Sequence, residues 1–459
     1  MRTAMIARIS PVALVLLLSQ ARAMDPPEPR LFSPHPGVLS IDVGPIRNAA
    51  GMAIQHDGTI ALAATPIVGG HAQPILLRVT RDGRLADRGI TPIAAVAMNA
   101  NDAAITPDGK IVVVGDGNAP RSAAGELQRD DFLVARFLPD GTPDRSFGQQ
   151  GWVMTDVGEL EDHDIPHSVA VQPDGKIVVT GVSNVRYWLI MRAYSFATVR
   201  YGLDGSLDKS FGDRGRVITR MGVSREDSAN AVLIQPDGKI VVAGTADSER
   251  EDRNSRGDFA LARYLPDGRL DNSFGLNGKA EPIGALGLGP LQNGIGRAAL
   301  DRSGRIVVGG FLTLSDDRPR SQTIARTPVL ARYARDGSLD RSFGTNGLVG
   351  PAPKGEVGQG GPIAIDSNGK IVTACRIPRG TGGPSWVVLR WNEDGSVDRS
   401  FGDSGFSSIP FITGASRMAF QEDGKLLVLG LGNKTIVLLR LNPDGTPDPG
   451  FGAAASHLR

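Results

Sequence analysis

The stretch LARYLPDGRLDNSFG, residues 261–275, decides the fold because close copies of it recur along the whole chain. Its glycine recurs at Gly83, Gly141, Gly205, Gly268, Gly337, Gly395 and Gly445. A second landmark, typified by AVQPDGKIVVTG at 170–181, alternates with it, and its glycine recurs at Gly58, Gly109, Gly175, Gly238, Gly304, Gly369 and Gly424. Glycines of one landmark lie about 61 residues apart on average, a spacing typical of a repeat architecture.

Each repeat is predicted to form four short strands. The second landmark is two apolar runs joined by an Asp-Gly turn, in which glycine takes the left-handed conformation, so it predicts a tight β-hairpin. A third strand such as 259–265, another Asp-Gly turn, the Ser-Phe-Gly segment and a fourth strand such as 215–219 follow. No helical period of 3.6 residues appears. The expected fold is therefore all-β, a seven-bladed β-propeller of four-stranded antiparallel blades.

Two further patterns place strands within this ring. Alanine stands five residues before the second-landmark glycine in six of the seven units, with apolar neighbours on both sides. A strand that is apolar on both faces is covered on both, so this one is predicted to be innermost. The last unit stops after Phe451-Gly452 without a fourth strand, and residues 31–44 resemble the missing piece. We therefore predict that Val38 to Val43 complete the last blade and close the ring.

The N-terminus predicts export. Arg2 and Arg8 precede an apolar run at 12–18 and an Ala-Arg-Ala stop at 21–23, so residues 1–23 are expected to be a cleaved secretory signal, with an uncleaved anchor as the alternative. The mature protein is then secreted or periplasmic, with one propeller domain at 24–452, a tail at 453–459 and no later membrane insertion. Its single cysteine, Cys375, excludes an intramolecular disulfide. A net charge of +1 argues against a general nucleic-acid binder.

Units such as 172–219 resemble the delta-60 repeats of bacterial exported proteins and, more distantly, the NHL-type propeller repeat. The resemblance covers nearly the whole mature chain, and its motifs are clear in six units. The first unit differs, because RLADRGI at 84–90 has no Ser-Phe-Gly. The resemblance implies a propeller used as a rigid scaffold, in a family without one shared chemistry.

An arginine five residues before the first-landmark glycine occurs in every unit, beginning with Arg78, and six units add an aspartate and a phenylalanine. A ring of arginines is one reading, as a site for polyanions. The interpretation favoured by the residues is structural, because a planar guanidinium suits a carboxylate or carbonyl at a blade edge. The structural set comprises Arg136, Arg200, Arg263, Arg332, Arg390 and Arg440 with Phe147, Phe211, Phe274, Phe343, Phe401 and Phe451.

No metal or other cofactor is expected. The turn aspartates do not form a D-x-D-x-D-G calcium loop. The weak metal candidates are Asp162, His163, Asp164 and His167, where Pro166 prevents a regular helix that would place both histidines on one face. A solvated acidic loop is the favoured interpretation of this segment. Templates for nucleophilic or zinc catalysis are absent, and Cys375 lies in an apolar strand.

The variable loops indicate where a ligand would bind. One face of the disc is expected to carry the same short Asp-Gly turns in every blade. The loops between the second and third strands differ greatly in sequence, and they share the other face with the blade-to-blade loops. Within them, Arg186, Tyr187, Trp188 and Tyr194 form an unusual group in a chain with 5% aromatic residues. They are candidates for a stacking patch; the alternative is an extended third strand or a plug packed on the next blade.

The first functional hypothesis is an exported, non-catalytic, monomeric scaffold that binds a protein or a saccharide through this face, without nucleic acid. The alternative is a propeller enzyme, a glycoside or lactone hydrolase or a lyase, with an acidic site at the central opening. A third hypothesis is a module of a larger assembly. Side chains around the axis should separate the first two, because a group of Asp, Glu, Asn and His there favours the enzyme.

Overall fold

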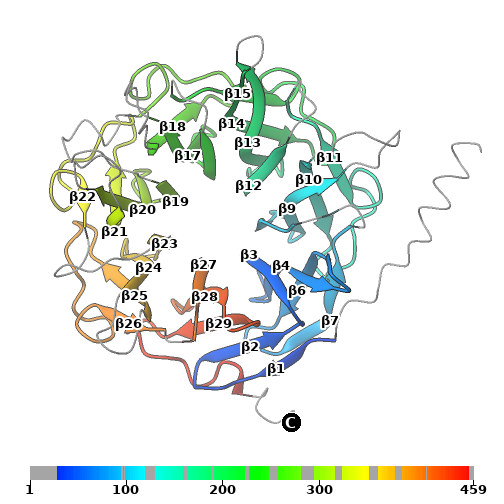
Figure 1. Cartoon of the computed structure of the whole chain (residues 1–459), viewed down its shortest axis with the longest axis vertical. Helices are drawn as coiled ribbons and strands as arrows, with labels where there is room; N and C mark the ends of the chain where they lie inside the picture. Colours follow the sequence, from blue (N-terminus) through cyan, green and yellow to red (C-terminus); the bar gives the residue numbers. More distant parts are fainter. Residues whose placement is uncertain are drawn as a thin grey trace, which may run out of the picture.

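The computed structural model describes residues 28–94, 97, 99–118, 130–158, 163–187, 191–222, 227–247, 257–280, 294–315, 323–350, 360–377, 385–409 and 411–453. These residues form seven antiparallel sheets arranged as blades around an axis, which confirms the predicted seven-bladed propeller (Figure 1). We number the blades 1 to 7 in the order of their first strands. No helix in the described part of the chain is long and apolar enough to cross a membrane.

The strands follow the repeat from the axis outward. The innermost strands are β3 (Ile46–Ile54), β8 (Asp102–Ile105), β12 (Asp164–Val171), β16 (Ser228–Ile234), β19 (Gly294–Leu300), β23 (Gly360–Ile365) and β27 (Gly414–Phe420). The second strands are β4 (Ile60–Val68), β9 (Ile111–Asn118), β13 (Ile177–Tyr187), β17 (Ile240–Asp247), β20 (Ile306–Ser315), β24 (Ile371–Ile377) and β28 (Leu426–Leu431). Each inner strand contacts the inner strand of the next blade, and β27 contacts β3, so the ring is closed at its centre.

The outer strands are less uniform. The third strands are β6 (Ile75–Val79), β10 (Asp130–Phe137), β14 (Met191–Tyr201), β18 (Gly257–Tyr264), β21 (Thr323–Tyr333), β25 (Ser385–Trp391) and β29 (Ile436–Leu441). The fourth strands are β7 (Leu85–Pro92), β11 (Trp152–Thr155), β15 (Arg216–Thr219), β22 (Leu348–Val349) and β26 (Phe406–Ser408), and β5 (His71–Ala72) pairs with β4 in blade 1. In blade 4 the described residues show three strands and a bridge between Ala262 and Lys279.

The N-terminal segment completes blade 7, as predicted. Strand β2 (Val38–Asp42) pairs with β29, with Val38 opposite Leu439, and β1 (Arg30–Phe32) adds a further strand outside it. The Arg440 N–H donates to the carbonyl of Gly37 at 2.8 Å, whereas Arg136 makes the same bond to Gly151 within its own blade. The exchanged strand therefore reproduces the bonding that other blades obtain from one continuous repeat.

The core consists of apolar clusters between neighbouring blades. Between blades 2 and 3, for example, Val112 and Phe132 pack with Val179 and Tyr201. Each blade therefore has two buried faces, which is why its strands are apolar at successive positions and do not alternate with polar residues. Both faces must be covered, so a blade depends on its neighbours for stability.

A repeated belt of arginine, aspartate and phenylalanine joins the blades on the turn face. In the repeat at 261–275, Arg263 Nε lies 2.8 Å from Asp271 Oδ2, and the guanidinium lies 4.6 Å from the centre of the Phe274 ring. Its Nη1 donates to the carbonyl of Arg335 in the next blade. The Gly275 N–H also donates to the next blade, at the Asp336 carbonyl. Six blades repeat this set, with cation–ring pairs Arg136–Phe147, Arg200–Phe211, Arg263–Phe274, Arg332–Phe343, Arg390–Phe401 and Arg440–Phe451.

Blade 1 lacks the Ser-Phe-Gly segment and bonds differently. Its arginine, Arg78, donates through Nη1 to the carbonyl of Asp87 in its own blade at 2.9 Å and to that of Asp140 in blade 2 at 2.7 Å. Nε lies 3.4 Å from Gln55 Oε1. Backbone carbonyls and an amide therefore replace the aspartate and the aromatic ring of the other blades.

Candidate functional site

The two faces of the disc differ in the way that the repeat predicts. First and second strands, and third and fourth strands, are joined by short turns whose glycines have positive φ, such as Gly175 at 85° and Gly205 at 85°. In an antiparallel meander the remaining connections emerge on the opposite face. The segments 119–129, 248–256, 316–322 and 378–384, which connect second to third strands, lie outside the described residues.

The predicted aromatic group lies on one long hairpin of this face. Strands β13 and β14 stay paired as far as Tyr187 opposite Met191, so the hairpin projects beyond its neighbours, which is the extended-strand alternative. Tyr194 is 36% exposed. The side chains of Arg186 and Tyr187, and all of Trp188, lie outside the described residues.

The predicted metal candidates are not brought together. Asp162 lies outside the described residues. The exposed His163 pairs through Nδ1 with Asp130 Oδ2 at 2.8 Å, whereas His167 Nδ1 contacts the carbonyl of Ala229 in the next blade at 2.9 Å. Asp164 is separated from both histidines and joins a different acidic group.

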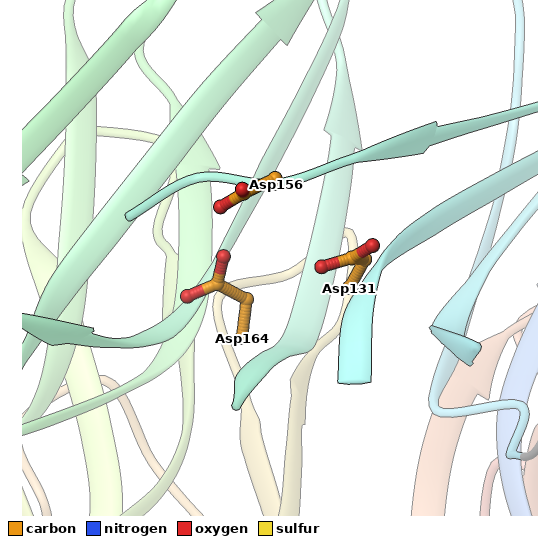
Figure 2. Close-up of side chains that lie close together, drawn as sticks. All are labelled: Asp131, Asp156 and Asp164. Carbon is orange, nitrogen blue, oxygen red and sulfur yellow. The ribbon is translucent and has the colours of Figure 1, made fainter. Parts of the chain in front are cut away.

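That group consists of Asp131, Asp156 and Asp164, at the loop-rich end of the junction between blades 2 and 3 (Figure 2). Asp131 is the second residue of β10, Asp156 follows β11 and Asp164 begins β12. One carboxylate oxygen from each residue lies within 4.8 Å of the other two. Asp164 is buried and Asp156 is exposed, so the group extends from the blade junction toward solvent.

Asp164 has a structural contact on one side. Its Oδ2 accepts the N–H groups of Val157 at 2.6 Å and Gly158 at 3.1 Å, which fixes the connection from blade 2 to blade 3. Burial raises the pKa of Asp164, and the negative charge of Asp156 acts in the same direction, although the two N–H groups and the adjacent Ser183 hydroxyl oppose it. The ionised form of Asp164 is therefore destabilised at this position.

Sequence reasoning selected Asp164 but missed Asp131 and Asp156. The signal was available in the repeats, because the corresponding positions one blade later hold Ser195, Arg220 and Asp227. Asp227 repeats the backbone contacts of Asp164, with its Oδ2 accepting the Met221 N–H at 2.7 Å. The loop contact thus recurs at the next junction, where neither of the two additional carboxylates is present.

Polar side chains also lie on the inner strands around the axis. Six of the seven inner strands, all except β8, have a register shift in their pairing with the second strand. In β12 the shift lies at His167, whose Nδ1 contacts the carbonyl of Ala229. Asn101 Nδ2 donates to the Pro166 carbonyl at 2.9 Å, and Arg297 Nη1 donates to the Asn230 carbonyl at 2.8 Å. Burial lowers the pKa of His167 below its ordinary value. These groups therefore bond one blade to another around the opening.

An apolar pocket of about 380 Å³ lies beside the exchanged N-terminal strand. His35 and Phe411 stack at its edge, with ring centres 4.1 Å apart. Val38, Ile412 and Leu439, which line the pocket, also belong to the apolar cluster between blades 6 and 7. Its lining side chains therefore contribute to packing at the point where the ring closes.

Comparison with known proteins supports the architecture. A family model described as a domain of unknown function (DUF5122), a beta-propeller, matches residues 106–147, 172–211, 235–274 and 421–451. Each match ends at the phenylalanine of a repeat, and together they cover less than half of the chain. No curated protein matches the sequence.

Solved structures with the same kind of fold include polysaccharide lyase Uly1, with a TM-score of 0.52 and 12% identity over 86% of this chain and 90% of that one. An ulvan lyase of family PL25 has a TM-score of 0.49 and 12% identity over 89% of this chain and 94% of its own. At such identities the likeness concerns the fold.

Proposed function

We propose that this protein is an exported, non-catalytic propeller scaffold that binds a saccharide or protein ligand through its loop-rich face. The observation that carries the proposal is the difference between the two faces. On the turn face, every blade repeats one pattern of turns, whereas the loop-rich face carries segments of different length and composition, including a hairpin that projects to Tyr187. Rigid frameworks that present variable loops are a common basis for recognition.

The belt residues support the assignment of the turn face to structure. Arg200, for example, bonds Asp208 at 2.8 Å and donates to the Pro266 carbonyl of the next blade at 2.6 Å, while its side chain is only 5% exposed. Because its guanidinium is nearly buried and already bonded to these oxygens, Arg200 is poorly placed to bind a polyanion. We therefore place recognition on the opposite face.

Glycan-array binding and affinity capture with the purified full propeller test this proposal. Tyr194→Ala should weaken capture of whatever ligand is found, because Tyr194 is exposed on the projecting hairpin. Leu203→Ala is the matched control, since Leu203 is 60% exposed on the turn face. Equal loss in both variants, or loss only in the control, would contradict the assignment of the face.

An enzyme acting on a sugar polymer is the second candidate. The observation in its favour is the presence of His167 and Asn230 on inner strands and of Asn101 directly before β8, with the pKa of His167 lowered by burial. A neutral imidazole is a suitable general base. Against this candidate, these groups have hydrogen-bond partners on neighbouring blades. Release of unsaturated or reducing ends from anionic polysaccharides, lost in His167→Ala, would support the enzyme and contradict the scaffold.

A further inference from the structure

The carboxylates of Asp131, Asp156 and Asp164 have the spacing of a metal site. Oxygen ligands of calcium lie about 2.3–2.6 Å from the ion, so two of them on opposite sides are separated by roughly 5 Å. The three oxygens here lie within 4.8 Å of one another, and they come from two different blades (Figure 2). One ion at their centre would be within bonding distance of all three.

A buried hydroxyl beside the group provides a second, independent observation. Ser183 on β13 is fully buried and stands directly opposite Asp164 on β12, so both side chains lie on the same face of the blade. Its Oγ lies next to the Asp164 carboxylate, but no group in the described part of the chain makes a hydrogen bond of proper geometry with it. A buried hydroxyl without such a bond is unfavourable, and a cation that accepts its lone pair would offset this cost.

The position of Gly158 shows that the two oxygens border one space. A side-chain carbon added to Gly158 would lie 2.8 Å from Ser183 Oγ and 3.6 Å from Asp164 Oδ1. The second oxygen, Oδ2, is the one that bonds the Val157 and Gly158 N–H groups. Asp164 can thus keep its loop contact through Oδ2 while Oδ1 faces an ion.

The repeats provide an internal comparison. At the next junction, Ser195 takes the place of Asp131 and Arg220 takes the place of Asp156, while the loop-fixing aspartate is retained as Asp227. The fold therefore requires only one of the three carboxylates. At the next junction the chain supplies a positive charge of its own, whereas the junction of blades 2 and 3 presents three negative ones.

We propose that Asp131, Asp156 and Asp164, with the hydroxyl of Ser183, bind a calcium ion at the junction of blades 2 and 3. Calcium is favoured because the donors are all hard oxygens and no histidine or cysteine of the described residues belongs to the group. Asp131 lies shortly after segment 119–129 and Asp156 shortly before segment 159–162, so the ion holds together described residues that flank both segments. This inference goes beyond the proposed function and does not depend on any ligand.

Calorimetric titration of the chelator-treated full protein with calcium, and separately with magnesium, tests the site. We expect a single calcium-binding event and a calcium-dependent rise in the melting temperature. Asp156→Asn should weaken the calcium affinity by about tenfold or more, because ligand charge tunes such sites. Absence of calcium binding at millimolar concentrations, or a response to magnesium alone, would overturn the proposal.

Two further variants separate coordination from folding. Asp156→Arg introduces the residue of the next junction, so it should abolish the calcium response while leaving the melting temperature of the calcium-free protein equal or higher. Asp227→Asn is the matched control for Asp164→Asn, because both remove a carboxylate that fixes a loop. Asp227→Asn should retain calcium binding and Asp164→Asn should lose it; equal retention in the two, or full binding in Asp156→Arg, would refute the assignment.

Discussion

Arg417 of blade 7 and Asp102 of blade 2 form a buried ion pair, with 2.8 Å between Nη2 and Oδ1, although blade 1 lies between their blades. Arg417 Nη2 also donates to the Asn101 carbonyl at 3.1 Å. The other oxygen of Asp102 accepts the Val169 N–H of blade 3 at 3.1 Å. One pair of side chains therefore connects three blades near the axis, 315 residues apart in the sequence.

Removing either partner of this pair should be costly. Arg417→Ala leaves the Asp102 carboxylate buried without its counter-ion, and such losses cost about 3–5 kcal/mol. We expect a decrease of this order in the free energy of unfolding, measured by urea denaturation. Arg84→Ala removes an ion pair to Asp82 in which both side chains are more than half exposed, and should change stability little. Equal effects of the two substitutions would contradict the special position of Arg417.

Loss of the exchanged strand should open the ring. Deletion of residues 28–43 removes β2 and exposes the edge of β29, so we expect aggregation or a large fall in the melting temperature. Deletion of residues 28–34 removes only the outer strand β1 and serves as the control. Size-exclusion chromatography and thermal melting distinguish the outcomes, and unchanged melting of the longer deletion would show that blade 7 is stable without the exchange.

Stability should fall in acid as the belt aspartates become protonated. Burial alone would raise the pKa of Asp144, but hydrogen bonds from Ser146 and the charges of Arg136 and Lys110 outweigh it and lower the pKa to about 2. Because the folded pKa lies below the unfolded value near 3.9, this contribution is complete above about pH 4 and is lost as the pH falls toward 2. Asp144→Asn should be less stable than the wild type at pH 6, and this difference should shrink toward pH 2 and vanish below it in denaturant titrations.

The thiol of Cys375 should report unfolding. Burial in β24 raises the pKa of Cys375 to about 12, and the side chain is nearly inaccessible. The native protein should therefore react negligibly with Ellman's reagent at neutral pH, whereas one thiol per chain should react in urea. Rapid reaction of the native protein would mean that blade 6 opens locally.

Much of the architecture could be predicted because each repeat carries its own pattern of turns and strands. Gly268 and Phe274 recur at fixed spacing, so alignment of the units predicts four strands per blade from the sequence alone. The closing strand at Val38 was also predictable, because it supplies what the last unit lacks. Both predictions rest on the residue pattern within one repeat, or on the strand that the last repeat lacks.

The acidic group and the axial ion pair could not be predicted in the same way. Asp131 and Asp156 become neighbours only through the pairing of β10 with β11, and Asp164 joins them only through the packing of blade 3 on blade 2. Arg417 meets Asp102 across the ring. Such contacts depend on how neighbouring blades are oriented, and the spacing of residues within one repeat does not predict that orientation.

The contacts that close the ring also impose an order on the folding of the blades. Ser416 Oγ donates to the Ala49 carbonyl at 2.6 Å, and the Gly452 N–H donates to the Asp82 carbonyl at 2.9 Å, so blade 1 obtains these partners from blade 7, which is synthesised after it. A growing chain is therefore an open arc with two unsatisfied ends. Blade 1 cannot complete its packing until blade 7 has been synthesised, and the contact with the largest sequence separation is the one that closes the ring.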